Sequence, residues 1–283
     1  MKVLLKRAMA FGDVLMTTPV ARRLAAAGHE VYVASNYLNV FEGNPDVAGV
    51  HEEGRDYGWV IDLDMAHEVR RDRHAAIAYM EAAFGDKGDG HDLGVSFAFG
   101  PPPDLGLDWR RVIAIHPNVS WRSRMLPPAW WQRVADKIAA SGYTVVQLGT
   151  GRDFFVPGVA DTRDRAAPRE QAAMIDAAAA FVCGPSGLFI LAGATRARVV
   201  TFLTINRAET CLPYRRGQLG WGYTAIPAAV PCVGCSERAA PTTFLGCERN
   251  DYACVGTFNP EEFAAAAVDA ARRRAEDEGW PIR

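Results

Sequence analysis

The sequence predicts an α/β fold with two Rossmann-like βαβ domains in tandem, facing each other across a cleft. Short apolar segments alternate with amphipathic segments along most of the 283-residue chain, which is typical of parallel strands joined by helices. Three consecutive prolines at 101–103 interrupt this alternation once, after which it resumes. A chain of this length can also bury two hydrophobic cores. We therefore expect domains at 1–105 and 106–283.

Strands and helices alternate in the first half. Three short apolar segments bounded by turn residues are the expected strands, namely KVLL at 2–5, HEVYVAS at 29–35 and YGWVIDLD at 57–64. Helices are expected over 13–28 and 67–85, each closed by a glycine. Such an alternation predicts a parallel sheet covered on both faces.

The same alternation returns after the prolines. The expected strands are RVIAIHP at 111–117, YTVVQLG at 143–149, AFVCG at 180–184 and RVVTFL at 198–203. The expected helices span 128–142, 168–179 and 188–195. A terminal helix is expected over 260–278, because Asn259 suits the N-cap, Pro260 the first helical position and Glu262 a capping box.

Charge and hydropathy exclude several classes of protein. The net charge of −2 at pH 7 and the pI near 6.3 give no global basic field, so we predict no nucleic-acid surface. No apolar run approaches the length that spans a bilayer. Asp13 interrupts the N-terminal apolar segment, which argues against a signal peptide, and we expect a cytoplasmic protein. The six cysteines are then expected as reduced thiols or metal ligands.

Gly12 and Asp13 lie at the corner between the first expected strand and its helix. Backbone N–H groups at such a corner often bind an anion, and the partial positive charge of the helix N-terminus favours an ionised carboxylate. One interpretation is an aspartate that caps the helix. The other is a general base or anion anchor at the carboxyl end of the strand, with Gly12 allowing close approach of a substrate to the backbone.

Two segments of the second half are suited to bind phosphate. In the sequence CGPSGL a strand ends in a turn, and Ser186, Gly187 and Leu188 begin a helix whose first N–H groups lack intrahelical partners. In an earlier loop, Arg122 and Arg124 can hold a diphosphate through charge-assisted hydrogen bonds. The alternatives are an ordinary turn with a serine N-cap and a solvated loop.

Asp62 and Asp64 lie two residues apart at the end of the third expected strand, a spacing that points both carboxylates to one face. Such a pair can bind a divalent cation or supply the nucleophile and acid of a phosphatase. The Thr or Val expected soon after the pair in such phosphatases is missing, which favours a structural or acceptor-binding role.

A group of four cysteines falls within 23 residues and begins with a Cys-x2-Cys pair. Its members are Cys232, Cys235, Cys247 and Cys254. Four thiolates match the ligand count of a tetrahedral structural zinc site and leave no coordination position open for catalysis. The alternatives are such a zinc site and reduced thiols in a loop.

Taken together and in this order, the motifs resemble glycosyltransferase family 9, the heptosyltransferases of bacterial surface-glycan assembly. The resemblance lies in GDVLMTTPVARRL, HPNVSWRSRMLPPAWWQRVADKIAASGYTVVQLGTGRD, DAAAAFVCGPSGLFILAGAT and the segment from PCVGC to NPEEF, and it spans most of the chain. It implies a GT-B fold with an acceptor-side domain at 1–105, a nucleotide-sugar donor domain at 106–283 and the active site between them.

Carried over by position, the resemblance implies that Asp13 is the catalytic base. It places the family's donor-binding lysine at Arg124 and its Asp-Ser/Thr-Gly turn at the Pro-Ser-Gly of 185–187. The family histidine three residues after that glycine is Ile190 in this chain. These departures leave the donor sugar and its base open, and the N-terminal domain is short for the fold.

The implied activity is an inverting transfer of a heptose or other hexose-like sugar from a nucleoside-diphosphate donor to a hydroxyl acceptor, such as a glycan. The donor is an ADP-sugar by family default, held by Gly12, the two arginines and residues 186–188, and no metal is required for catalysis. Peripheral contact with the inner membrane face fits this role. The alternatives are a non-catalytic nucleotide- or glycan-binding protein and a metal-dependent phosphatase built on Asp62 and Asp64.

Overall fold

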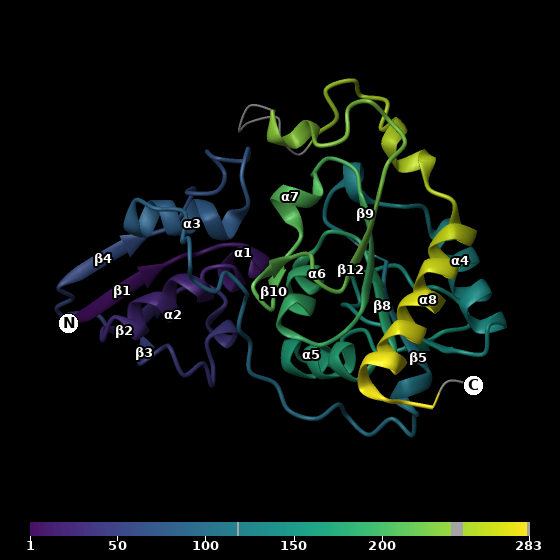
Figure 1. Cartoon of the computed structure of the whole chain (residues 1–283), viewed down its shortest axis with the longest axis horizontal. Coiled ribbons are helices and arrows are strands. Elements are labelled where there is room, and N and C mark those ends of the chain that lie inside the picture. The colour runs from purple at the N-terminus through teal and green to yellow at the C-terminus, as the bar shows by residue number, and fades with distance from the viewer. Residues whose placement is uncertain (118, 239–245, 282–283) are drawn as a thin grey trace. The chain divides into compact units, whose positions relative to one another are not determined.

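The chain divides into two compact units (Figure 1). The computed structural model describes residues 1–117, 119–238 and 246–281. Unit 1 comprises Met1–Ala98 and Glu209–Trp221, and unit 2 comprises Phe99–Ala208 and Gly222–Arg283. Unit 1 is thus built from two separate stretches of the chain, because residues 209–221 pack with residues 1–98. The domain limits predicted from the sequence did not include this return.

Unit 1 contains a parallel sheet with the strand order β3-β2-β1-β4. Its strands are β1 (Lys2–Lys6), β2 (Glu30–Ala34), β3 (Gly49–Val50) and β4 (Trp59–Asp62). Apolar residues fill the middle of β1, which is buried between its two neighbours. This is the order of a Rossmann half, in which the connections reverse direction at β1 and β4.

The helices of unit 1 differ from the prediction at their ends. Two helices, α1 (Phe11–Leu15) and α2 (Thr18–Ala26), occupy the stretch predicted as one helix, so that prediction was wrong. Pro19 has no N–H to donate to the preceding turn, and the break falls just before it. α3 (Ala75–Phe84) begins later than predicted, because His74 has an extended backbone (φ −63°, ψ 140°) and caps the helix by accepting a hydrogen bond from the N–H of Ala76.

His74 ties α3 to the returning segment of unit 1. The residue is buried, its Nδ1 accepts a hydrogen bond from the N–H of Ala76 (3.1 Å), and its Nε2 lies 3.1 Å from the carbonyl oxygen of Leu212. Its ring also meets the edge of Tyr214. Since Nδ1 accepts and Nε2 donates, the ring is neutral. Burial, followed by the charge of His67, lowers the pKa of His74 to about 4.

Acid is therefore expected to destabilise the protein through His74. The unfolded chain binds a proton at this ring near the usual histidine pKa of 6.5, whereas the folded chain does so near 4, so stability is complete above pH 6.5 and is lost as pH falls towards 4. The free energy of unfolding should fall by up to about 3 kcal/mol across this range. Urea denaturation of the wild type and His74→Asn at pH 7 and pH 4.5 measures it. An equal loss in both proteins would exclude His74 as the cause.

Unit 2 contains a larger parallel sheet with the order β12-β9-β8-β5-β6-β7, which is also a Rossmann order. Its strands are β5 (Val112–His116), β6 (Thr144–Gln147), β7 (Ala160–Asp161), β8 (Ala180–Cys183), β9 (Val199–Leu203) and β12 (Tyr223–Pro227). β5 pairs with β8 from Ile113 opposite Ala180 to His116 opposite Cys183. The reversal of the connections lies between these two strands.

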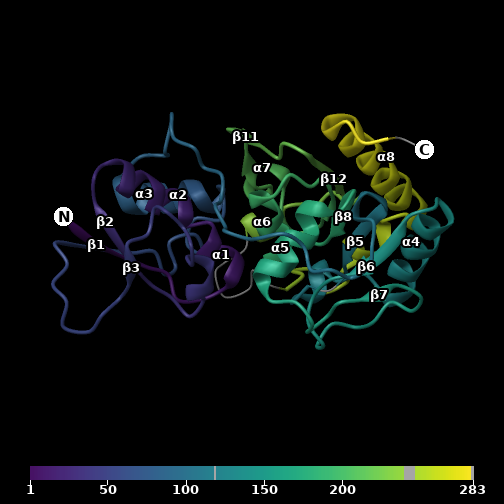
Figure 2. The same ribbon diagram turned by 90° about the horizontal axis from the view of Figure 1, so that it is seen from below.

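Helices cover both faces of the unit 2 sheet. They are α4 (Pro128–Ala140), α5 (Pro168–Ala177), α6 (Gly187–Leu191) and α8 (Pro260–Glu278). Figures 1 and 2 show α4 and α8 on one side and α5 and α6 on the other. The fully buried Trp131, Phe202 and Phe263 belong to the core between the sheet, α4 and α8. Asn259 caps α8, as predicted, by accepting a hydrogen bond from the N–H of Glu261.

Short elements missed by the sequence pattern complete the chain. α7 (Ala208–Cys211) stands at the crossing into unit 1, where β10 (Tyr214–Arg215) and β11 (Gln218–Leu219) form a small antiparallel hairpin. Their residues are too few to show a period.

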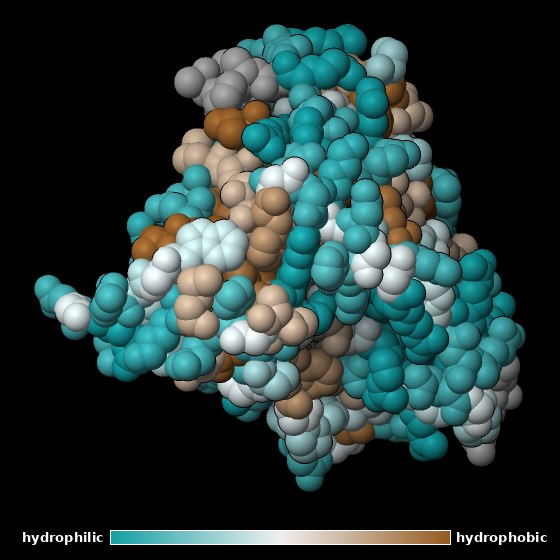
Figure 3. Space-filling view, turned by 60° about the vertical axis from the view of Figure 1, so that its left-hand side comes forward, coloured by the Kyte–Doolittle hydropathy of each residue, from teal (hydrophilic) through white to brown (hydrophobic). Residues whose placement is uncertain are grey.

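The surface carries exposed apolar side chains from separate parts of the chain, including Met9, Val60, Val69 and Phe155. The face in Figure 3 is mainly hydrophilic, with hydrophobic residues in small groups. Among the described residues, no helix combines the length and apolar character that crossing a membrane requires.

Candidate active site

Both sheets carry polar side chains where their connections reverse. Ligands of open parallel sheets bind beyond the carboxyl ends of the strands at this point. In unit 1 the strands end at Lys6 and Asp62, and in unit 2 they end at His116 and Cys183.

Asp13 lies just beyond β1, next to Gly12 in the first turn of α1. Ala10 occupies the N-cap with a φ of 65°, so capping does not explain Asp13. The Oδ2 atom of Asp13 is 3.5 Å from Nη2 of Arg7, and its Oδ1 atom is 3.8 Å from Nδ1 of His67. The side chain is 26% exposed, which leaves the carboxylate accessible to a ligand while two basic groups hold it.

Arg7 is a buried cation with fixed geometry. Its side chain is 4% exposed, and its two terminal nitrogens donate to Glu68 at 3.2 and 2.5 Å, while Nη1 also donates to the carbonyl of Leu63. Burial opposes its charge, but the bond to Glu68, with Tyr79 and Asp13 nearby, raises the pKa of Arg7 overall. Arg7 therefore orients Asp13 without being able to take its proton.

Asp62 and Asp64 fix the loop beside this cluster. Asp62 accepts a hydrogen bond from Nζ of Lys6 (2.8 Å), which lowers the pKa of the Asp62 carboxyl, and Asp64 accepts one from the N–H of Ala8 (2.8 Å). Across the described ranges, no group of three or more His, Cys, Asp or Glu residues is placed to hold a metal ion. These contacts support the structural role and give no support to a metal-dependent phosphatase.

In unit 2, Arg124 meets the turn between β8 and α6. Its Nη1 atom donates to the carbonyl of Pro185 (3.0 Å). Ser186 is the N-cap of α6, and its Oγ atom accepts from the N–H of Phe189 (3.4 Å). Gly187 and Leu188 form the first turn of α6. The structure thus brings Arg124 together with the predicted phosphate-binding turn.

Arg122 takes a different position, with its guanidinium 4.4 Å from the ring centre of Tyr252 in the cysteine segment.

The turn between β8 and α6 depends on Gly184, because a Cβ atom there would lie 2.7 Å from Cζ of Phe202 and 2.8 Å from Cγ1 of Val119. The tight packing fixes the path of the backbone into Ser186.

A cluster that the sequence did not predict lies beside Ser186. His116, at the end of β5, has its Nδ1 atom 3.2 Å from Oγ of Ser186 and its Nε2 atom 3.6 Å from Oδ2 of Asp153. The same Asp153 oxygen accepts from the N–H of Thr150 (2.7 Å). A histidine at a strand end was visible in the sequence, but its partners come from two distant loops.

This cluster has the composition of a hydrolase triad but not its geometry. Ser186 has an extended backbone, with φ −147° and ψ −178°. In a nucleophile elbow the serine sits on a sharp, strained strand-to-helix turn. The extended serine instead serves as a helix N-cap.

The predicted cysteine ligands lie close enough to affect one another. Burial, followed by the charges of the other three cysteines, raises the pKa of Cys254, and neighbouring cysteines also raise that of Cys235 after burial. Gly234, with φ 77°, allows the tight turn between Cys232 and Cys235. The thiols are in their reduced form. They are not converged on a metal-holding geometry in the described part of the chain, and zinc stays a prediction.

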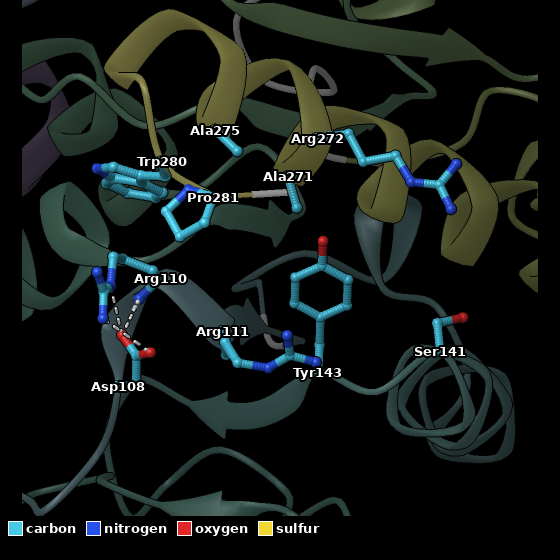
Figure 4. Close-up of a pocket in the computed structure, with 10 residues that line it drawn as sticks. All are labelled: Asp108, Arg110, Arg111, Ser141, Tyr143, Ala271, Arg272, Ala275, Trp280 and Pro281. Atoms are coloured by element: carbon cyan, nitrogen blue, oxygen red, sulfur yellow. Dashed lines mark hydrogen bonds and ion pairs between the residues drawn. The ribbon is translucent and has the colours of Figure 1, made fainter. Parts of the chain in front are cut away.

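A pocket of about 230 Å³ lies at the opposite edge of the unit 2 sheet (Figure 4). It is lined by Asp108, Arg110, Arg111, Ser141, Tyr143, Ala271, Arg272, Ala275, Trp280 and Pro281. The lining residues near the sheet precede β5 and β6, so the pocket is at the amino ends of the strands. Arg110 is already paired with Asp108. The pocket is therefore separate from the turn that Arg124 contacts, which lies at the carboxyl ends of the strands.

The fold is that of known glycosyltransferases. A glycosyltransferase family 9 protein from Veillonella parvula DSM 2008 aligns with a TM-score of 0.74 at 14% identity, covering 96% of this chain and 97% of the other. The iron-containing dodecameric heptosyltransferase TibC of enterotoxigenic E. coli H10407, solved with ADP-D-β-D-heptose, gives 0.73 at 15%, covering 98% and 79%. E. coli ADP-heptose LPS heptosyltransferase II gives 0.65 at 12%, covering 96% and 99%.

These likenesses confirm the predicted α/β fold with two Rossmann-like units. Protein-family models yield no match to the sequence, and neither do curated proteins.

Proposed function

We propose that the chain is an inverting glycosyltransferase of family 9, which moves a sugar from an ADP-sugar to a hydroxyl acceptor. The observation that carries this proposal is the placement of Asp13. It is a partly exposed carboxylate just beyond β1 of the first sheet, and it lies between Arg7 and His67. A positioned carboxylate within reach of an acceptor hydroxyl is what a general base requires.

The proposed reaction is a single displacement at the anomeric carbon. The acceptor oxygen forms a bond to that carbon as its proton passes to Asp13, and the bond to the phosphate oxygen breaks with its electron pair leaving on the nucleoside diphosphate. Arg7, which Glu68 holds in place through two hydrogen bonds, orients the carboxylate of Asp13.

Unit 2 supplies the proposed hold on the donor. Arg124 and the backbone N–H groups of 186–188 are suited to stabilise the charge that builds on the departing diphosphate. Arg122 lies over the ring of Tyr252. Gly12 has no side chain, which would let a substrate approach the backbone closely. With these charges supplied by the chain, we propose that catalysis requires no metal.

The donor class is supported by what similar structures contain. TibC is solved with ADP-D-β-D-heptose, and the E. coli heptosyltransferase WaaC with ADP. Arg124 in place of a lysine keeps the charge but presents a planar fork, which leaves the sugar open. We propose a glycan as the acceptor and the cytoplasm, with contact to the inner membrane face, as the location.

The proposal is tested by ligand-induced stabilisation and donor consumption. ADP is expected to raise the thermal midpoint, because a ligand at about 100 times its Kd stabilises the native state by about 2.7 kcal/mol. Arg124→Met should lose most of this stabilisation, whereas the matched variant Arg110→Met, at the other edge of the sheet, should keep it. Release of ADP from ADP-D-β-D-heptose with a bacterial glycan extract then tests transfer.

Two outcomes would contradict this reading. Equal loss of ADP stabilisation in both variants would remove Arg124 from the donor site. Binding of ADP without consumption of any ADP-sugar would favour the alternative, a nucleotide- or glycan-binding protein on the same fold.

A further inference from the structure

We propose that His116 is a positioning residue of the donor site: held between Asp153 and Ser186, it turns the Ser186 hydroxyl towards the diphosphate when its ring binds a proton. The inference rests on the proposed function, since it takes the diphosphate to lie at the Ser186 turn. It adds that binding of the nucleotide is coupled to protonation of one named side chain.

The neutral cluster has a defined hydrogen-bond direction. Asp153 is pinned by the N–H of Thr150, and its carboxylate can only accept. At 3.6 Å, its negative charge favours the His116 tautomer with the proton on Nε2. The Nδ1 atom is then an acceptor, and the Ser186 hydroxyl, 3.2 Å away, donates to it.

In this state the hydroxyl group of Ser186 is unsuited to bind phosphate. Its hydroxyl proton points to His116, and its oxygen already accepts from the N–H of Phe189. What the oxygen presents outward is a lone pair, which repels the phosphate oxygens because they too are acceptors.

Protonation reverses the direction of the chain. Both ring nitrogens of His116 then donate, Nε2 towards Asp153 and Nδ1 to the oxygen of Ser186. The hydroxyl group of Ser186 no longer donates to His116, so its O–H can point outward to a phosphate oxygen. The positive charge on the ring adds to the attraction, and Asp153 compensates it from behind.

The surroundings of His116 favour a switch between two defined states. The ring is 8% exposed, so few waters compete for its nitrogens. The charged and titratable groups around His116 are Asp153, Arg124 and Cys183. The backbone carbonyl of Asp153 accepts a hydrogen bond from Arg163, and Arg124 donates to the carbonyl of Pro185. Cys183 lies opposite His116 on the neighbouring strand. Burial raises the pKa of the Cys183 thiol well above its usual value, so that group stays neutral.

Titration calorimetry with ADP tests the inference. Binding is measured at pH 7 in two buffers with different ionisation enthalpies, and the difference in heat gives the protons taken up per ADP. The wild type should take up more protons than His116→Gln, by up to one. His51→Gln, which alters an exposed histidine of unit 1, should behave as the wild type. Between pH 6 and 8 the wild-type affinity should fall relative to His116→Gln, by at most about tenfold per pH unit.

Ser186→Ala provides a second variant in case His116→Gln folds poorly. It keeps the histidine but removes the hydroxyl, so it should lose ADP affinity more at pH 6 than at pH 8. Equal proton uptake in the wild type and both variants would overturn the role of His116 and leave the proposed function standing. Absence of ADP binding by the wild type at every pH would overturn the proposed donor site itself, and the inference with it.

Discussion

Replacing Asp13 by asparagine is expected to lower sugar transfer by about 10²–10⁴-fold, the usual contribution of a general base, while ADP still binds. Asparagine has nearly the same shape but cannot accept the proton of the attacking hydroxyl. Arg7 keeps its two bonds to Glu68 in this variant, so the local fold should persist. The measurement is the rate of ADP release from the sugar nucleotide, with ADP affinity determined in parallel by calorimetry.

Asp62→Asn is the matched control for this variant. Asp62 also lies at the carboxyl end of the first sheet, but its carboxylate is engaged by Lys6. Transfer should change little in Asp62→Asn. Unchanged turnover in Asp13→Asn would remove Asp13 as the base, and loss of ADP affinity in the same variant would indicate a structural role.

The second large effect is expected at the cysteine segment, where we propose a structural metal held by Cys232, Cys235, Cys247 and Cys254. Elemental analysis of the purified protein should find about one equivalent of zinc. Cys235→Ser should lose the metal and lower the thermal midpoint by several degrees, because metal binding contributes directly to folding free energy.

Cys211→Ser is the control, since Cys211 lies in the segment that packs with unit 1 and outside the proposed ligand set. It should retain the metal and the midpoint of the wild type. A purified protein without zinc, and equal stability of the two variants, would establish the alternative of reduced loop thiols.

Much of the fold was predictable because its elements leave local signals. The buried strands read as short apolar runs, and parallel pairing then puts Lys6, Asp62, His116 and Cys183 at the carboxyl edges. The positions of Asp13 and Ser186 just beyond strand ends follow from the same pattern. Even the break between α1 and α2 has a local signal in Pro19.

What could not be predicted depends on contacts between distant segments. The late start of α3 reflects the extended backbone of His74, which caps the helix and whose ring reaches the carbonyl of Leu212 far along the chain. The meeting of His116 with Asp153 depends on the loop after β6, where Gly149 adopts a φ of 127°. Likewise, nothing local in residues 209–221 shows which unit they pack with.

The return of residues 209–221 has a consequence for engineering the protein. A fragment of residues 1–98 lacks the Leu212 carbonyl that accepts from His74 and the ring of Tyr214 that packs against it. Unit 1 is therefore not a module that can be cut out at a single point. A chimaera that exchanges this unit with that of a structurally similar protein needs three junctions, one near residue 98 and one at each end of 209–221. A simple fusion at the proline-rich segment would combine residues 1–98 of one protein with the 209–221 segment of the other.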